Sequence, residues 1–237
     1  MTLTVHHLGV SQSDRAVWIC EELGIDYELK KYDRSPLMSP PEYKALHPLG
    51  SAPVIEDGDV RLAESGACVE YILQVYGKGK FSIAPGQKDY AQYLYWFHFA
   101  NGTLQPTLLL NLSMSRTGLG DDAEIVKRYK AKQDEILKFV DQRLSEAPWL
   151  AGDQFTAADI MNVCCLTTMR SFIQYDLSSY PSILAYLKRV AARDGYRRAM
   201  EKGDPDLNVD KLVGAAPPPL HKGVVAAMQA MQARGRI

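Results

Sequence analysis

The sequence predicts an α/β first half, in the order β-α-β-α-β-β-α, followed by an all-helical second half. Strand-like runs alternate with helical periodicities up to about residue 80, and from residue 87 onward only helical patterns follow. The chain has 237 residues, of which 46% are hydrophobic and 23% charged, so it is long enough for two modest domains. We expect domains at 1–80 and 87–214, a linker at 81–86 and a C-terminal tail at 215–237.

Periodicity predicts the first elements. Residues 3–8 and 27–33 are predicted strands, because they are rich in β-branched residues or alternate between polar and apolar ones. Between them, apolar residues at helical spacing predict a helix that begins at about Ser13 and ends at Gly24. These apolar residues are Ala16, Ile19, Cys20 and Leu23.

Proline and turn residues organise the next segment. Residues 35–50 are interrupted by prolines, so they have room only for a turn or a short helix. Asp57–Gly58 lies between two strand-like runs and predicts a hairpin. A helix that begins at Glu64–Ser65 follows, and its buried face is predicted to contain Val69, Ile72, Leu73 and Tyr76.

The second half contains a succession of predicted helices. A long one covers residues 87–116, with a kink between Gly102 and Pro106. A charged helix at 121–145 has a predicted inner stripe of Ile136, Phe139, Val140 and Leu144. The next helix begins at Thr156, where Asp159 completes a capping box, and the last covers 181–194.

The C-terminal tail follows a proline-rich segment at 214–220 and contains a short amphipathic helix. Its apolar stripe consists of Val224, Val225, Met228 and Met231. We expect this stripe to fold back on the body of the protein or to pack on a partner subunit.

Composition excludes several classes of function. A formal net charge of −1 argues against a nucleic-acid-binding surface, and no apolar run approaches the ~18 residues of a membrane span. The N-terminal residues show no signal-peptide pattern, and the four cysteines show no metal or disulfide spacing, so we expect a cytoplasmic protein with reduced cysteines. The five histidines do not combine with acids or cysteines at metal-ligand spacings, so we expect no metal site.

Several motifs occur in an order that resembles one family. They are the serines of "SQSDR" (11–15), "HPLGSAPVIEDG" (47–58), "LAESGACVEYI" (62–72) and "GDQFTAADI" (152–160). Together with the two-part layout, they resemble the cytosolic glutathione transferases of the serine type over nearly the whole chain. "NGTLQP" (101–106) is similar to a segment of a fungal and bacterial group within that family. The resemblance implies a thioredoxin-like first domain that binds glutathione.

The resemblance also implies how glutathione is held. The Ala52–Pro53 bond is expected to be cis, which turns the Ala52 backbone toward the cysteinyl unit of the tripeptide. Glu64 and Ser65 are expected to bind the γ-glutamyl end, at a helix N-terminus that suits a carboxylate. Some relatives use a lysine for the glycyl carboxylate where this chain has Ser51, so Lys44 and His47 are both candidates.

The chemistry requires a thiolate at neutral pH. Lowering a thiol pKa by about two units from ~8.5 corresponds to roughly 2.7 kcal/mol of anion stabilisation, which a hydroxyl donor and backbone amides can supply. Ser11 has the spacing from Arg15 of the family's serine, while Ser13 is the alternative and could simply cap the helix. His7 is a possible helper, and Arg15 is expected to anchor the helix to the sheet or to the domain interface.

The expected activity is conjugation of glutathione to small hydrophobic electrophiles, with glutathione peroxidase activity as a possible side reaction. Tyr95, Phe99 and Leu104 are candidate walls of the electrophile pocket. Glutathione is a co-substrate and no cofactor is expected. The family implies a homodimer, to which the aromatic helix at 90–99 could contribute. The alternative function is that of a non-catalytic binding or dimerisation module, or of a ligand carrier.

Overall fold

The computed structural model describes the backbone of residues 2–233 and the side chains of residues 2–230. The first half contains a four-stranded mixed sheet with the strand order β2-β1-β3-β4. Strand β1 pairs in parallel with β2 and antiparallel with β3, and β3 pairs antiparallel with β4. The strands are β1 (Thr4–Leu8), β2 (Glu28–Tyr32), β3 (Val54–Asp57) and β4 (Val60–Ala63). The predicted α/β class is therefore confirmed.

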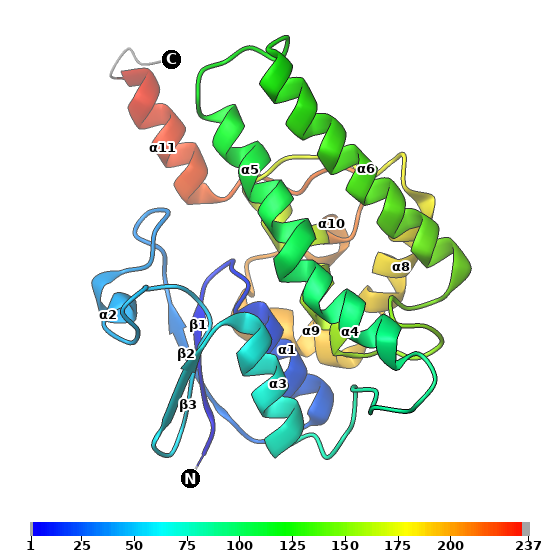
Figure 1. Cartoon of the computed structure of the whole chain (residues 1–237). Helices are drawn as coiled ribbons and strands as arrows, with labels where there is room; N and C mark the ends of the chain where they lie inside the picture. The colour runs from blue at the N-terminus through cyan, green and yellow to red at the C-terminus, as the bar shows by residue number, and fades with distance from the viewer. Residues whose placement is uncertain (1, 234–237) are drawn as a thin grey trace.

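Helices cover both faces of this sheet (Figure 1). Helices α1 (Asp14–Leu23) and α3 (Ser65–Val75) pack together between the sheet and the helical half, whereas α2 (Pro41–Lys44) lies on the other side. Tyr43 of α2 forms a small separate core with residues of β1, β3 and β4. Because both faces are covered, all five residues of β1 are buried, which is typical of a strand inside a layered α/β domain.

The predicted helix and hairpin ends match the structure closely. Gly24 ends α1 in the left-handed conformation, with φ of 65°, as a C-terminal glycine commonly does. The β3–β4 hairpin turns at Gly58, whose φ is 61°. Val69, Ile72 and Leu73 of α3 are fully buried, and Tyr76 is half-buried at its C-terminal end.

The second half is helical throughout its described elements (Figure 1). The helices are α4 (Tyr90–Phe99), α5 (Gln105–Ser115), α6 (Glu124–Glu146), α7 (Ala157–Leu166), α8 (Pro181–Ala191), α9 (Asp194–Gly203), α10 (Val209–Leu212) and α11 (Lys222–Ala233). A π-helical turn, Ala100–Leu104, joins α4 to α5, and a short 3-10 helix, Thr168–Ser171, follows α7. The kink predicted between Gly102 and Pro106 is thus a π-helical turn, a common cause of helix bends.

One predicted core position is wrong. Phe139 is 45% exposed, and Leu137 takes part in the inner face of α6 with Ile136, Val140 and Leu144. The Phe139 ring stacks on Trp96 of α4 at 5.4 Å between centroids, so it covers a neighbouring helix at the surface. A large aromatic side chain can do this because its ring reaches beyond the stripe defined by helical spacing.

Helix α9 attaches the sheet domain to the helical half through α1. Arg193 donates two hydrogen bonds of 2.7 Å to the Glu22 carboxylate, and Arg198 and Lys202 both pair with Glu21. Trp18 of α1 packs edge-on against Tyr196 at 4.8 Å between ring centroids. The two halves therefore share a continuous apolar core.

The tail folds back on the body at the base of α11. The His221 N–H donates to the Ser171 carbonyl at 2.8 Å, and its ring stacks on Phe172. A Cβ atom at Gly223 would lie 2.1 Å from the Pro36 carbonyl oxygen, so only glycine allows this close approach. Farther along the predicted stripe, Val225 and Met228 are exposed, and the Met231 side chain lies outside the described residues.

Helix α7 is buried on every side, and its N-terminus depends on Asp159. The Asp159 carboxylate accepts the N–H groups of Leu150 and Thr156, at 3.0 and 2.9 Å, and the Tyr186 hydroxyl at 3.1 Å. The predicted capping box is therefore confirmed.

We predict that Asp159→Ala lowers the free energy of unfolding by about 3 kcal/mol or more, because it leaves three buried donors without an acceptor. Urea denaturation followed by circular dichroism measures the change. Asp153→Ala is the control: Asp153 is an exposed aspartate paired with Lys88 at 3.4 Å, and its loss should change stability by less than about 0.5 kcal/mol. Equal effects of the two substitutions would contradict the capping role.

Candidate functional site

Two positions of unusual backbone conformation mark one region of the first domain. Val10 has φ of 50° and Glu64 has φ of 71°, values that residues with a Cβ rarely adopt. Val10 immediately precedes Ser11 at the end of β1, and Glu64 immediately precedes Ser65 at the start of α3. Such conformations cluster at functional sites, so the structure points to the region that the sequence motifs predict.

Ser11 and Ser13 lie side by side in the turn between β1 and α1, which we call the serine loop (residues 9–13). Their Oγ atoms are 2.7 Å apart. The Ser11 hydroxyl is half-buried and lies 2.7 Å from the Leu8 carbonyl oxygen, while the Ser13 N–H donates to Ser11 Oγ at 3.2 Å. Ser13 is fully buried, and its Oγ accepts the Leu8 N–H at 3.1 Å. The two hydroxyls thus share one hydrogen-bonded unit.

Two further side chains complete this unit. His7 Nδ1 lies 2.9 Å from Ser13 Oγ, and His7 Nε2 lies 3.1 Å from Asp204 Oδ2. The other carboxylate oxygen of Asp204 accepts the Val10 N–H at 2.8 Å. His7 was a sequence candidate, but Asp204 was missed, because it lies 197 residues away and no local pattern marks it.

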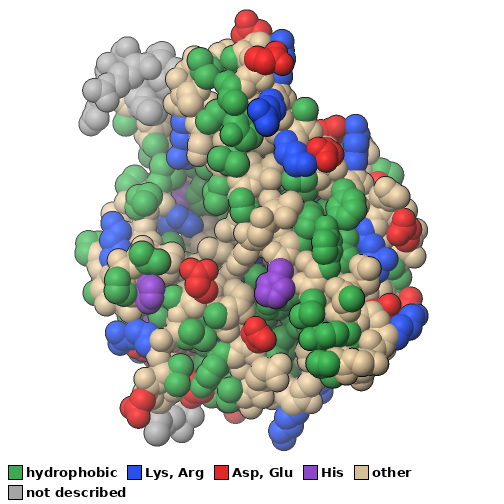
Figure 2. All heavy atoms as spheres, viewed as in Figure 1, with side chains coloured by type: hydrophobic (Ala, Val, Ile, Leu, Met, Phe, Trp, Pro, Cys, Tyr) green, Lys and Arg blue, Asp and Glu red, His purple; other side chains and the backbone are tan. Residues whose placement is uncertain are grey.

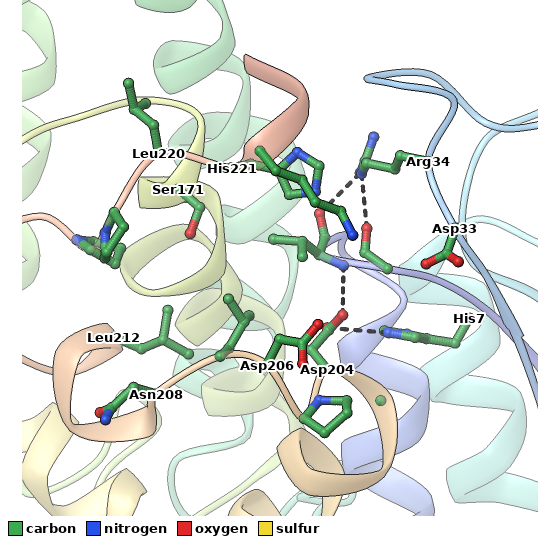
Figure 3. Close-up of a pocket in the computed structure, with 18 of the residues that line it drawn as sticks. His7, Asp33, Arg34, Ser171, Asp204, Asp206, Asn208, Leu212, Leu220 and His221 are labelled. Carbon is green, nitrogen blue, oxygen red and sulfur yellow. Dashed lines mark hydrogen bonds and ion pairs between the residues drawn. The ribbon is translucent and has the colours of Figure 1, made fainter. Parts of the chain in front are cut away.

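A cavity of about 430 Å³ opens beside the serine loop (Figure 3). It lies between the ends of β1 and β2, the segment after α9 and the base of α11. Arg34 donates from this cavity to the Gly9 and Val10 carbonyls, at 2.8 and 3.0 Å, and so holds the loop from the other side. Arg34 was also missed by sequence reasoning.

Ser65 lies at the N-terminus of α3 next to a buried cation. The Arg15 guanidinium is fully buried and lies 2.8 Å from Ser65 Oγ and from Asn101 Oδ1. It also donates to Gln12 and Gln105. Among the described residues, no carboxylate lies within ion-pair distance of Arg15. The groups that accept hydrogen bonds from its guanidinium are therefore all neutral.

The proline loop (residues 47–53) leads directly into β3. The Ala52–Pro53 bond is cis, as the resemblance implies. In the described structure, neither the N–H nor the C=O of Ala52 takes part in a backbone hydrogen bond. These groups are available to an extended peptide, since β3 begins only at Val54.

The structure places the remaining candidates farther apart. Lys44 is exposed at the end of α2, and His47 is half-buried in the loop that follows; no described contact joins either to Ser65. Phe99 and Leu104 belong to the core, with 6% and 1% of their surfaces exposed. Tyr95 is 50% exposed and packs against Phe139, on the surface where α4 meets α6. None of these three lines the cavity beside the serine loop, and their pocket role stays a prediction.

Burial changes the ionisation of one carboxyl next to the site. Desolvation raises the pKa of Asp14 to about 6, although Arg15 and a hydrogen bond from Thr168 oppose this shift. The second oxygen of this carboxyl has no hydrogen-bond partner. Asp14 is therefore a half-buried residue with a buried carboxyl oxygen, and its pKa lies well above the usual range at the start of α1.

No metal-binding arrangement accompanies these groups. Within the described residues, no three His, Cys, Asp or Glu side chains gather as they would around a metal ion. Among residues 2–233, no helix is both long and apolar enough to cross a membrane. The described site consists of hydroxyls, side-chain amides, backbone groups, one imidazole and a few isolated charged side chains.

The fold and the site together define a two-domain protein of a thioredoxin-like sheet domain and a helical domain, with a polar site at their junction. The family model for the glutathione S-transferase N-terminal domain matches residues 1–74, and that for the C-terminal domain matches residues 102–194. Glutathione S-transferase 3 of Schizosaccharomyces pombe is 33% identical over 217 residues, which cover 84% of this chain and 87% of that protein.

One solved structure and a second sequence relative agree with this result. A glutathione S-transferase from Actinobacillus pleuropneumoniae has 34% sequence identity and a TM-score of 0.78, covering 86% of this chain and 93% of that one. Glutathione S-transferase 1 of Saccharomyces cerevisiae is 27% identical, covering 84% of this chain and 94% of that protein. The chain belongs to the glutathione S-transferase family, and its enzyme class is that of a glutathione transferase.

We predict that Asp14→Asn changes stability in a pH-dependent way. The folded-state pKa of Asp14 lies above its reference value of 3.8, so the protonated acid stabilises the fold below that value and the benefit is lost as the pH rises through about 6. The neutral amide avoids this loss. Relative to the wild type, the variant should therefore gain about 2 kcal/mol in free energy of unfolding between pH 4 and pH 7.5. Urea titrations at both pH values test this, and a difference that is the same at both would contradict it.

Proposed function

We propose that glutathione binds across the starts of α1 and α3, with its γ-glutamyl carboxylate at Ser65. The buried Arg15 guanidinium, which forms no salt bridge, lies 2.8 Å from the Ser65 hydroxyl and favours an anion there. The free amides at the N-terminus of α3 add to this attraction, and the exposed Glu64 suits the ammonium group. Ala52 pairs with the cysteinyl unit through its two unpaired backbone groups.

Ser11 is the proposed donor to the thiolate of the bound tripeptide. Its hydroxyl is half-buried, whereas Ser13 has no exposed surface and already contacts His7 and the Leu8 amide. A single hydroxyl proton can point either to the Leu8 carbonyl or to an incoming sulfur. Lys44 or His47 serves the glycyl carboxylate, and glutathione is a co-substrate that requires no additional cofactor.

The proposed reaction joins the thiolate to small hydrophobic electrophiles, with peroxide reduction as a side activity. Since Phe99 and Leu104 are buried, they support the helical half from within, and Tyr95 is the predicted wall with an accessible ring. The cysteines Cys20, Cys68, Cys164 and Cys165 are free and buried, which suits the reducing cytoplasm as the proposed location.

A homodimer is the proposed assembly. Exposed apolar side chains gather over α4, α5 and α6 (Figure 2), and they include Leu94, Tyr95, Leu109, Leu110 and Phe139. Patches of this kind commonly mark interfaces between subunits.

Sedimentation at micromolar concentration should give the mass of two chains, and Tyr95→Glu should shift the distribution toward monomers. A wild-type protein that sediments as a monomer would contradict the proposal.

We predict that Ser11→Ala lowers kcat by about tenfold or more, because it removes the donor to the thiolate, and leaves the Kd for glutathione within about threefold. Conjugation of chloro-dinitrobenzene measures the rate, and calorimetry with reduced glutathione measures binding. Ser113→Ala is the control, since the exposed Ser113 also donates to a backbone carbonyl, at 2.9 Å. An unaffected pH–rate profile in Ser11→Ala would transfer the role to Ser13, and absence of glutathione binding to the wild type would refute the proposed function.

A further inference from the structure

We propose that His7 is the base that receives the thiol proton of glutathione, through Ser13 and Ser11, and that Asp204 holds His7 in the tautomer this requires. The inference rests on the proposed position of the thiol at Ser11. The proposed function makes Ser11 the hydrogen-bond donor to the thiolate, and this inference adds the group that takes up the proton of the thiol.

A continuous line of short contacts joins the four side chains. Ser11 Oγ lies 2.7 Å from Ser13 Oγ, and Ser13 Oγ lies 2.9 Å from His7 Nδ1. His7 Nε2 lies 3.1 Å from Asp204 Oδ2. Ser13, His7 and Asp204 have 0%, 1% and 7% of their surfaces exposed, so water has little access to compete for these bonds.

The hydrogen-bond capacity of each group determines which atom donates and which accepts in each of these contacts. An ionised carboxylate only accepts, and one oxygen of Asp204 is already committed to the Val10 N–H at 2.8 Å. Its other oxygen therefore accepts a hydrogen bond from the N–H of His7 Nε2. Figure 3 marks the contact between these two side chains. In neutral His7 the remaining nitrogen, Nδ1, is then an acceptor, and the Ser13 hydroxyl donates to it.

Backbone groups keep the two hydroxyls in position. The Leu8 N–H donates to Ser13 Oγ at 3.1 Å, and the Ser13 N–H donates to Ser11 Oγ at 3.2 Å. Because the Ser13 proton is used on His7, Ser13 Oγ accepts from Ser11. The Leu8 carbonyl, 2.7 Å from Ser11 Oγ and 3.2 Å from Ser13 Oγ, is the alternative acceptor for either hydroxyl proton before glutathione is bound.

The net result of the transfer is that glutathione loses one proton and His7 gains one. The glutathione S–H bond breaks as its proton passes to Ser11 Oγ, the Ser11 proton passes to Ser13 Oγ, and the Ser13 proton passes to His7 Nδ1. Both serines end as neutral hydroxyls, and the products are a thiolate and an imidazolium paired with Asp204. The shift also reverses both hydroxyls, so Ser11 now donates to the thiolate, which is the role proposed for it above.

The surroundings of His7 favour this outcome. An ordinary thiol, with a pKa of ~8.5, would give up its proton to an ordinary imidazole, with a pKa of ~6.5, in only about one pair in a hundred. The Asp204 carboxylate, 3.1 Å from His7 Nε2, provides the charge-assisted hydrogen bond that an imidazolium at this position can form. The other titratable or charged groups that face the pair are Asp14, Arg34, Tyr196 and His221.

His7 and Asp204 also line the 430 Å³ cavity (Figure 3). After the thiolate has reacted, the Nδ1 proton leaves through Ser13 and Ser11 to solvent, which returns His7 to the tautomer with its proton on Nε2. His6 offers a contrast in the same strand: it is equally buried, but its nitrogens bond Tyr32 and Glu56.

The decisive experiment follows the His7 ring directly. In protein labelled with 15N-histidine, saturating glutathione near pH 7 should convert the His7 signals from those of a neutral ring to those of an imidazolium. S-methylglutathione has no thiol proton and should leave the ring neutral, with comparable binding by calorimetry. Assignment uses His7→Asn, which loses the responding signals. A His7 ring that stays neutral with glutathione bound would overturn the relay and leave the proposed function intact, whereas glutathione that fails to bind would overturn both.

Variants provide a second readout. His7→Asn keeps an acceptor near the Nδ1 position but cannot take up the proton, so kcat/KM should fall about tenfold or more near pH 6.5 and recover above about pH 9, where the thiol ionises unaided. Asp204→Asn should show the same pattern, because an amide donor facing Nε2 reverses the tautomer of His7. His6→Asn, the matched control, should leave the shape of the pH profile unchanged. A pH profile that is identical in His7→Asn and the wild type would also overturn the relay.

Discussion

The architecture of the site depends on one buried cation at the junction of the two domains. The Arg15 guanidinium donates to residues from the serine loop, α3, the π-helical turn and α5, and these are Gln12, Ser65, Asn101 and Gln105. A planar fork of five donors suits this task, because it can satisfy several acceptors in fixed directions at once. Arg15 thus joins the domains at the place where the tripeptide is proposed to bind.

Arg15 forms no salt bridge within the described structure, and this has a functional consequence. Burying a charge without a counter-ion is unfavourable, so the free site lacks a negative group that a bound carboxylate could supply. The π-helical turn contributes to this arrangement, since it carries Asn101 into contact with both Arg15 and Ser65. The π-helical turn that joins α4 to α5 therefore also contributes a side chain to the site.

A second network lies on the other side of the serine loop. Asp204, which follows α9, bonds the Val10 N–H and His7, and Arg34 bonds the carbonyls of Gly9 and Val10. These contacts surround the one residue of the loop with positive φ, so they stabilise a backbone that is unfavourable by itself. The ion pairs between α1 and α9 keep this segment close, which couples the helical half to the geometry of the serines.

The sequence by itself determined the local elements and motifs in both halves of the chain. Helix periodicity, Gly24, the Asp57–Gly58 turn and the Thr156–Asp159 capping box depend on residues a few positions apart, so local patterns predict them well. Phe139 shows the limit of such patterns, because its ring packs against a helix that is distant in sequence.

Only the tertiary structure decided which polar groups meet. His7 and Asp204 are 197 residues apart, and Arg15 reaches residues up to 150 positions away, so no spacing in the chain could reveal these contacts. The same holds for the serines: the sequence placed both in one turn, and only the packed structure distinguishes the buried Ser13 from the half-buried Ser11. Burial and long-range hydrogen bonds arise when separate elements pack together, and they are therefore properties of the fold that local sequence does not encode.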